Sequence, residues 1–172
     1  LFVCANASNP HKGFKYFEQL ASEFESDSNI QFICLSLEQY SNHFHSNITF
    51  LNPLKDIGLL AKIYSECDVS LVLSKKETFS MPTAESLCCG TKVAGFECGG
   101  AESIASGENA IFVEHGNIDL LKKAINQILS ENYDKQKVSA FSREIYLSDN
   151  MINKFLEIYN LNDNSKAFSI EI

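Results

Sequence analysis

The 172-residue sequence predicts an α/β fold with a doubly wound, six-stranded parallel sheet flanked by helices. Short apolar runs rich in β-branched residues alternate with amphipathic stretches from the first residue to about residue 130, which is typical of repeated strand–helix units. The chain is also 45% hydrophobic. A chain of this size buries about 70% of the surface that its unfolded form exposes, so one domain with one sheet is expected.

Six short apolar runs are the predicted strands, because each has strand length and lies between turn-forming residues. They are 1–5 (LFVCA), 30–36 (IQFICLS), 48–51 (ITFL), 69–74 (VSLVLS), 92–96 (KVAGF) and 110–114 (AIFVE).

Amphipathic stretches between these runs predict helices at 14–25, 54–67, 81–89, 101–106 and 117–131. The last of them repeats apolar residues at helical spacing on one face: Ile118, Leu121, Ile125 and Ile128. Beyond residue 134 no further strand is predicted, and two helices are expected at about 135–145 and 149–160.

Charge and composition exclude several classes of function. The formal net charge of −8 leaves no general surface for nucleic acid, so any phosphate must be bound locally. No apolar run is long enough to span a bilayer and no signal peptide opens the chain, so a soluble, cytoplasmic protein is expected.

The six cysteines form no Cys-x-x-Cys pair, which indicates reduced thiols. His43, His45 and His115 lack metal-ligand spacing, so no metal site is predicted.

Two polar loops are expected to form one ligand crevice. Doubly wound sheets bind ligands beyond the carboxyl ends of the strands, where the strand order reverses. In the Rossmann-like order 3-2-1-4-5-6 the first and fourth strands are neighbours at that point. The loops 6–13 (NASNPHKG) and 75–80 (KKETFS) follow these two strands and should face each other.

The second of these loops leads into a predicted helix with an anion-binding start. In the stretch 75–90 (KKETFSMPTAESLCCG), Pro82 suits the first helical turn, and Ser80 or Met81 suits the N-cap or the first helical position. Free N–H groups around Ser80, Met81 and Thr83, with the helix dipole, would bind a diphosphate.

Two carboxylates flank this predicted anion site. Glu85 could accept the vicinal hydroxyls of a ribose, and Glu77 lies on the other side, so the pair would match the ribose–diphosphate–sugar layout of a nucleotide sugar. The alternative is structural: Glu85 stabilises the first turn of its helix, and Glu77 forms a solvated ion pair with Lys75 or Lys76.

The first loop offers a cation opposite this site. Lys12 is a point charge at a helix start and Gly13 permits a tight turn, although the same pair also fits an ordinary turn with a surface lysine.

The two glycines of 97–103 (ECGGAES) would let the backbone approach a ligand, or simply form a turn. No Gly-x-Gly-x-x-Gly or Walker A motif is present, which argues against dinucleotide oxidoreductases and P-loop enzymes.

Several segments, in order, resemble one enzyme family. They are HKGF, ITFL, KIYSECDVSLVLS, ETFSMPTAESLCCGTKVAGFECGGAESI, GENAIFV and NIDLLKKAINQIL. Together they resemble the C-terminal, donor-binding half of GT-B glycosyltransferases, especially the retaining family 4 (glycosyl transferases group 1). The resemblance extends over nearly the whole chain.

The resemblance implies roles for particular residues. Glu77 would contact the donor sugar or stabilise charge near its anomeric carbon, and Lys12 would neutralise the leaving diphosphate. The donor sugar and diphosphate would contact Gly13, Phe79, Ser80, Met81 and Thr83, and the nucleoside would contact Glu85, Asn52 and Leu54. Retention of configuration, a UDP-sugar donor and no metal or other cofactor are expected.

The sequence departs from the family pattern at four places. The family's Gly-Arg pair after the first strand is missing from CANASNPHKG, so the diphosphate would depend on Lys12 with help from Asn6 or Ser8, or be held more weakly. Thr78 and Ser80 replace common glycines, which is tolerable if both keep negative φ. Lys92 replaces a common proline, a change expected to be neutral.

The expected domain division follows the resemblance. Residues 1–148 would form the nucleotide-sugar-binding domain, 149–162 a terminal helix that crosses to a missing N-terminal domain, and 163–172 a tail. The chain opens on a strand without an initiator methionine, so it is expected to be a fragment that binds nucleotide weakly and transfers nothing alone. A saccharide or lipid-linked acceptor would bind through the missing domain, and the full-length protein could associate peripherally with the cytoplasmic face of the membrane.

Two other functions remain open at this point. A nucleotide-sugar epimerase shares the GT-B fold, although the Glu77–Glu85 spacing argues against it. A non-catalytic nucleotide-sugar-binding module is the other, and the missing arginine motivates it.

Overall fold

The computed structural model describes residues 1–4, 7–36, 45–105 and 107–159. Asn6, His43 and the predicted tail at 163–172 lie outside these residues. Within them, one six-stranded sheet has the order β3-β2-β1-β4-β5-β6, with every neighbouring pair parallel. The predicted fold class and strand order are therefore confirmed, and the order reverses between β1 and β4.

The strands occupy the predicted places but are mostly shorter. They are β1 (Phe2–Val3), β2 (Phe32–Leu35), β3 (Ile48–Leu51), β4 (Ser70–Val72), β5 (Val93–Phe96) and β6 (Ala110–Val113). Residues at the ends of the predicted runs, such as Ser36, Ser74 and Glu114, instead belong to the loops at the edges of the sheet.

Seven α-helices and two 3₁₀ turns accompany these strands in the described chain, and the last three α-helices follow the last strand. The α-helices are α1 (Phe14–Glu23), α2 (Ile57–Glu66), α3 (Met81–Cys88), α4 (Gly100–Ile104), α5 (Ile118–Ser130), α6 (Lys135–Tyr146) and α7 (Ser148–Ile158). The 3₁₀ turns are η1 (Pro10–Lys12) and η2 (Gly107–Asn109). The helix predicted from residue 54 begins at Ile57, because the Asp56 side chain caps it by accepting hydrogen bonds from the N–H groups of Gly58 and Leu59.

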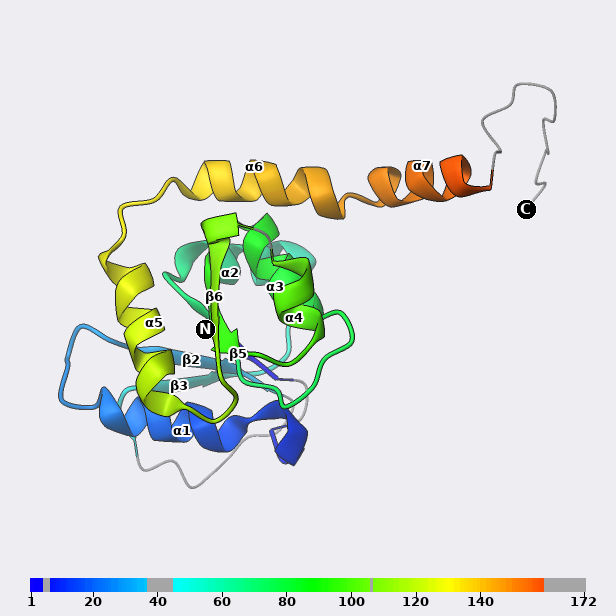
Figure 1. Cartoon of the computed structure of the whole chain (residues 1–172). Helices are drawn as coiled ribbons and strands as arrows, with labels where there is room; N and C mark the ends of the chain where they lie inside the picture. Colours follow the sequence, from blue (N-terminus) through cyan, green and yellow to red (C-terminus); the bar gives the residue numbers. More distant parts are fainter. Residues whose placement is uncertain (5–6, 37–44, 106, 160–172) are drawn as a thin grey trace.

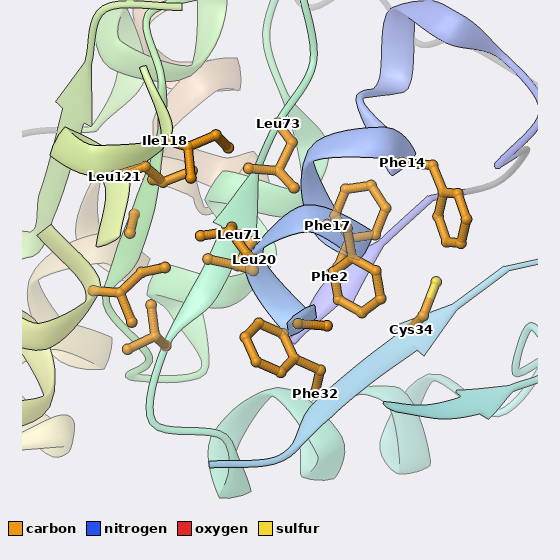
Figure 2. Packing of buried hydrophobic residues seen from close by; sticks show 14 of the residues in the cluster. Phe2, Phe14, Phe17, Leu20, Phe32, Cys34, Leu71, Leu73, Ile118 and Leu121 are labelled. Carbon is orange, nitrogen blue, oxygen red and sulfur yellow. The ribbon is translucent and has the colours of Figure 1, made fainter. Parts of the chain in front are cut away.

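One face of the sheet is covered by α1 and α5 (Figure 1). Phenylalanines at helical spacing place α1: Phe17 stacks on Phe2 of β1 with a centroid distance of 5.0 Å and meets Phe32 of β2 edge-on at 5.6 Å. Figure 2 shows these rings in the centre of the core, beside Phe14 and Leu20. Such aromatic contacts are directional, so they determine where the start of α1 lies relative to β1.

The other face carries α2, α3 and α6. Tyr64 of α2 is 1% exposed and packs with Leu1 and Leu35, while Leu87 of α3 packs with Val72 and Val93 of the sheet. The two helices that lead out of the strand ends nearest the reversal, α1 and α3, therefore lie on opposite faces of the sheet.

The last helix lies away from this body. Figure 1 shows α7 following α6 outward from the domain, and no α7 residue is buried against the described chain. Its apolar side chains are about half exposed, at 55% for Met151 and 50% for Phe155. The predicted helix therefore exists, whereas its role in joining another domain stays a prediction.

None of the described helices is long and apolar enough to cross a membrane. All six cysteines are free thiols. Burial raises the pKa of Cys34 to about 12 and that of Cys98 to about 11, so both behave as small core residues rather than as nucleophiles.

Candidate functional site

The two predicted loops meet at the carboxyl edge of β1 and β4. The backbone N–H of Lys75 donates to the carbonyl of His11 at 2.7 Å, which joins the loops. Lys12 Nζ lies 2.8 Å from Glu77 Oε1 and forms an ion pair with it. The structure thus brings together the two residues expected to be catalytic, which are 65 positions apart in the chain.

A close backbone approach places Lys12. The Asn9 side chain accepts from the N–H of His11 at 2.9 Å and so caps the short η1 turn, which ends at Gly13 with φ of 79°. A Cβ at Gly13 would lie 2.0 Å from the carbonyl oxygen of Leu73. Gly13 therefore does more than turn the chain, because only glycine lets η1 press against the end of β4.

The loop after β5 holds the backbone of Glu77 in place through two hydrogen bonds. The N–H of Glu77 donates to the carbonyl of Cys98, and the N–H of Gly100 donates to the carbonyl of Glu77, each at 2.8 Å. A Cβ at Gly100 would lie 2.4 Å from the backbone carbon of Thr78. Gly100 thus permits close contact with the Glu77 loop, where the sequence had left open a contact with a ligand or a plain turn.

Glu102 secures this supporting loop. Its carboxylate accepts from the N–H of Gly99 at 2.6 Å and from that of Cys98 at 2.9 Å at the start of α4, which is the acidic half of a capping box, because the N-cap Gly99 has no side chain. Burial opposes its charge, but these backbone hydrogen bonds outweigh burial and lower the pKa of Glu102.

The start of α3 differs from the prediction at Ser80. Ser80 is the N-cap, as expected, but its φ is 71°, so the negative φ that was the condition for a tolerable replacement of glycine is not met. It is also buried, and its Oγ lies 2.8 Å from Oγ1 of Thr83, which fixes the side chain without capping the helix. A serine in the left-handed region costs about 1–3 kcal/mol, and such strain gathers at functional sites.

This strained cap changes which N–H groups are free. The N–H of Thr83, expected to bind phosphate, donates to the carbonyl of Ser80 at 3.0 Å, and Pro82 has no N–H. Within the described chain, the N–H groups of Phe79, Ser80 and Met81 have no acceptor. These three lie at the positive end of α3, where a helix start can bind an anion. The side chains of Phe79 and Met81 are 43% and 58% exposed beside it.

A tyrosine that the sequence did not single out orients Glu85. The hydroxyl of Tyr64 donates to Glu85 Oε2 at 3.0 Å, and the hydroxyl of Thr91 donates to the backbone carbonyl of Tyr64 at 2.6 Å. Burial, and then the carboxylate of Glu85, raise the pKa of Tyr64 far above its ordinary value, so the hydroxyl keeps its proton as a donor. Glu85 itself is half-buried, and Oε1 has no partner in the described chain.

The predicted nucleoside residues follow β3. Asn52 is exposed in the loop between β3 and α2, and Leu54 is half-buried in the same cluster as Tyr64. Leu54 therefore packs against the cluster that contains Tyr64, the residue that donates to Glu85.

Lys92, whose replacement of a common proline was expected to be neutral, makes two specific contacts in the structure. It is 6% exposed, its Nζ lies 2.6 Å from Glu131 Oε2, and the same Nζ lies 4.9 Å from the centre of the Tyr133 ring. It therefore links the start of β5 to the end of α5.

Two further residues were expected to help Lys12 bind the diphosphate. Of these, Asn6 lies outside the described residues and Ser8 is exposed. Among the described residues, no group of three His, Cys, Asp or Glu side chains could hold a metal ion.

Solved structures share this fold. HepE from Anabaena in complex with UDP superposes with a TM-score of 0.74 at 15% identity, over 93% of this chain and 48% of HepE. A variant of TarM from S. aureus, in complex with fondaparinux, α-GlcNAc-glycerol and UDP, superposes with a TM-score of 0.69 at 15% identity, over 92% of this chain and 35% of TarM. Sucrose-phosphate synthase from Thermosynechococcus elongatus superposes with a TM-score of 0.68 at 18% identity, over 93% of this chain and 45% of the synthase. The chain thus spans about half the length of these proteins, or less.

Sequence comparison identifies the family. No curated protein matches the chain. The family model described as glycosyl transferases group 1 matches residues 1–131, which hold the whole sheet and every site residue described above. The chain therefore belongs to the glycosyl transferases group 1 family.

Proposed function

We propose that this chain is the nucleotide-sugar donor-binding domain of a retaining glycosyltransferase that uses a UDP-sugar. The observation that carries the proposal is the Lys12–Glu77 ion pair at 2.8 Å, beside a helix start with three free N–H groups. HepE, which has a similar fold, has been solved in complex with UDP and with UDP-glucose, and this supports the choice of nucleotide.

The diphosphate would lie at the start of α3. The N–H groups of Phe79, Ser80 and Met81 would donate to its oxygens, and each hydrogen bond to a charged group contributes about 1.5–3 kcal/mol. Lys12 would neutralise the charge that develops on the leaving diphosphate, so this site would need no metal or other cofactor. Gly13 contributes by placing Lys12, and Thr83 by holding the side chain of Ser80.

The carboxylates would act at the two ends of the diphosphate. Glu85, held through Oε2 by Tyr64, would accept the ribose hydroxyls, with Asn52 and Leu54 beside the base. Glu77, held by Lys12 and by the backbone of Cys98, would contact the donor sugar or stabilise positive charge at its anomeric carbon.

Transfer would need an acceptor-binding domain, because the chain covers no more than about half of the similar structures. In this proposal residues 1–148 bind the donor, and 149–162 form the helix that joins the other domain. The acceptor would be a saccharide or a lipid-linked glycan precursor. The enzyme would work in the cytoplasm, with peripheral association at the membrane for a lipid-linked acceptor.

Calorimetric titration with UDP and UDP-glucose tests the proposal. We expect weak, saturable binding by the wild type and at least about tenfold weaker binding by Glu85→Ala, a loss of about 1.4 kcal/mol. Glu66→Ala is the matched control, because Glu66 is an exposed carboxylate near the amino end of β4. A folded wild type that binds neither ligand would disprove the donor-binding role.

Incubation with a UDP-sugar separates the remaining functions. Isomerised sugar without an acceptor would indicate an epimerase. Donor binding with no turnover, even by full-length protein with many acceptors, would indicate a non-catalytic module.

A further inference from the structure

A second cationic cavity lies beside the proposed donor site. It has a volume of about 390 Å³. Its lining residues come from the loops after β1 and β6, the start of α1 and the loop after β4: Pro10, His11, Lys15, Tyr16, Lys75 and His115. Two lysines and two histidines line it, and no carboxylate does. This stands out in a chain with 22 acidic and 14 basic residues.

The walls of this cavity are held in place by contacts within the protein. The hydrogen bond from Lys75 N–H to the His11 carbonyl joins two of its sides. Tyr16 meets Phe96 edge-on at 5.0 Å and His115 edge-on at 5.5 Å, and His115 lies 5.1 Å from Phe96. The imidazole is thus packed between two aromatic rings on the side of the sheet that α1 covers.

Among the described residues its two lysines lack carboxylate partners, and Nζ of Lys15 lies 4.6 Å from the centre of the Tyr16 ring. Within the described chain no carboxylate pairs with Lys15 or Lys75, whereas Lys12, Lys92 and Lys122 each have one. Nε2 of His115 is buried without a hydrogen-bond partner. A buried nitrogen without a partner costs free energy unless a ligand or water satisfies it. The positive end of α1 also begins next to the cavity, at Phe14.

The cavity is separate from the proposed diphosphate site. Lys12 is not among its lining residues, because its side chain turns to Glu77. Lys15 and Tyr16 belong to α1, on one face of the sheet, while the free N–H groups belong to the start of α3, which packs on the other face. The same edge of the sheet therefore carries two positions for anions.

We propose that this cavity binds a phosphate ester carried by the acceptor, so that the substrate class is a phosphorylated saccharide or polyol. This rests on the proposed function, because it places the acceptor beside the donor. Lysine and histidine suit a phosphate, which takes point charges and imidazole donors. The volume lies in the usual range for small-molecule sites and leaves room for the group that the phosphate carries.

Nuclear magnetic resonance of the histidine rings tests the proposal. Titrations of labelled wild-type protein with glucose 6-phosphate, glycerol 1-phosphate, inorganic phosphate and glucose should shift the His115 ring signals saturably for the two esters. Inorganic phosphate should bind several-fold more weakly, and glucose should cause no shift. Equal affinity for inorganic phosphate and the esters would refute an acceptor site and indicate a free-phosphate site.

Variants separate the two sites. The double variant Lys15→Ala with Lys75→Ala should bind the esters at least tenfold more weakly and keep its affinity for UDP. Lys62→Ala with Lys154→Ala, two exposed lysines outside the cavity, removes the same charge and should leave ester binding unchanged. Equal losses in the two double variants would overturn the proposal.

Further controls cover misfolding and the donor site. If the Lys15, Lys75 double variant does not fold, Lys75→Gln alone should still weaken ester binding severalfold. Glu85→Ala should bind UDP at least about tenfold more weakly and keep its affinity for the esters. Ester binding with no UDP binding by any folded variant would leave an anion site but refute both its acceptor role and the donor proposal.

Discussion

Replacement of Gly13 by alanine should be the most damaging single-methyl change at the site. Two costs add. An alanine with φ near 79° loses about 1–2 kcal/mol in the left-handed region. The added Cβ would also lie 2.0 Å from the Leu73 oxygen and 2.7 Å from its carbonyl carbon, so the loop must move by more than about 1 Å from β4. Overpacking of this kind costs about 1–3 kcal/mol more.

Gly107 provides the matched control. Its φ is 69°, but a Cβ there would meet no atom within 4 Å. Gly107→Ala should therefore lose only the conformational part, and the entropy that alanine removes from the unfolded chain is the same in both variants. We expect Gly13→Ala to have a free energy of unfolding about 1–3 kcal/mol lower than Gly107→Ala.

Urea denaturation followed by circular dichroism measures this difference, with unchanged slopes as the check on two-state behaviour. Lys12 adjoins the glycine, so folded Gly13→Ala should also bind UDP more weakly than Gly107→Ala. Equal free energies of unfolding for the two variants would show that the contact with Leu73 does not position the loop.

Three further changes test other parts of the structure. Tyr64→Phe should weaken UDP binding about fivefold in calorimetry by releasing Glu85, a loss of about 1 kcal/mol with the fold retained; unchanged affinity would contradict its orienting role. Lys92→Ala should lower the free energy of unfolding by about 1–2 kcal/mol through lost packing and the lost Glu131 pair, and no change in the urea midpoint would restore the neutral reading. The lowered pKa of Glu102 means that its charged form stabilises the fold above the ordinary carboxyl pKa and that this stability is lost as pH falls through the lowered value. The urea midpoint of the wild type should therefore fall more steeply below about pH 4.5 than that of Glu102→Gln, and parallel curves would refute this.

The elements of the fold could be predicted because their signals are local. Apolar residues at helical spacing mark α5, and compact apolar runs mark β2, β3 and β5, so the element order and the sheet order followed from the pattern. Boundaries were less accurate where a polar side chain intervenes. The capping contact of Asp56, for example, starts α2 three residues later than its apolar pattern suggested.

The candidate site was predictable in part because the strand order follows from the sequence pattern. Lys12 and Glu77 follow strands that meet at the reversal of strand order, so topology alone brings their loops together. The partner of Glu85 was not predictable, because Tyr64 looks like any apolar helical residue until α2 packs against α3. The positive φ of Ser80 was also hidden, since it depends on how the loop after β5 holds residues 77–79.

Strand–helix alternation, the parallel sheet and the loops that carry the site follow from the sequence, because periodicity and glycine or proline placement act over a few residues. Which groups are paired and which are free depends instead on tertiary packing. It joins Lys92 to Glu131 across 39 positions. Among the residues that the structure describes, it pairs no carboxylate with Lys15 or Lys75 and buries Nε2 of His115 without a hydrogen-bond partner. Pairing and burial depend on distances between segments far apart in the chain, and packing alone sets those distances.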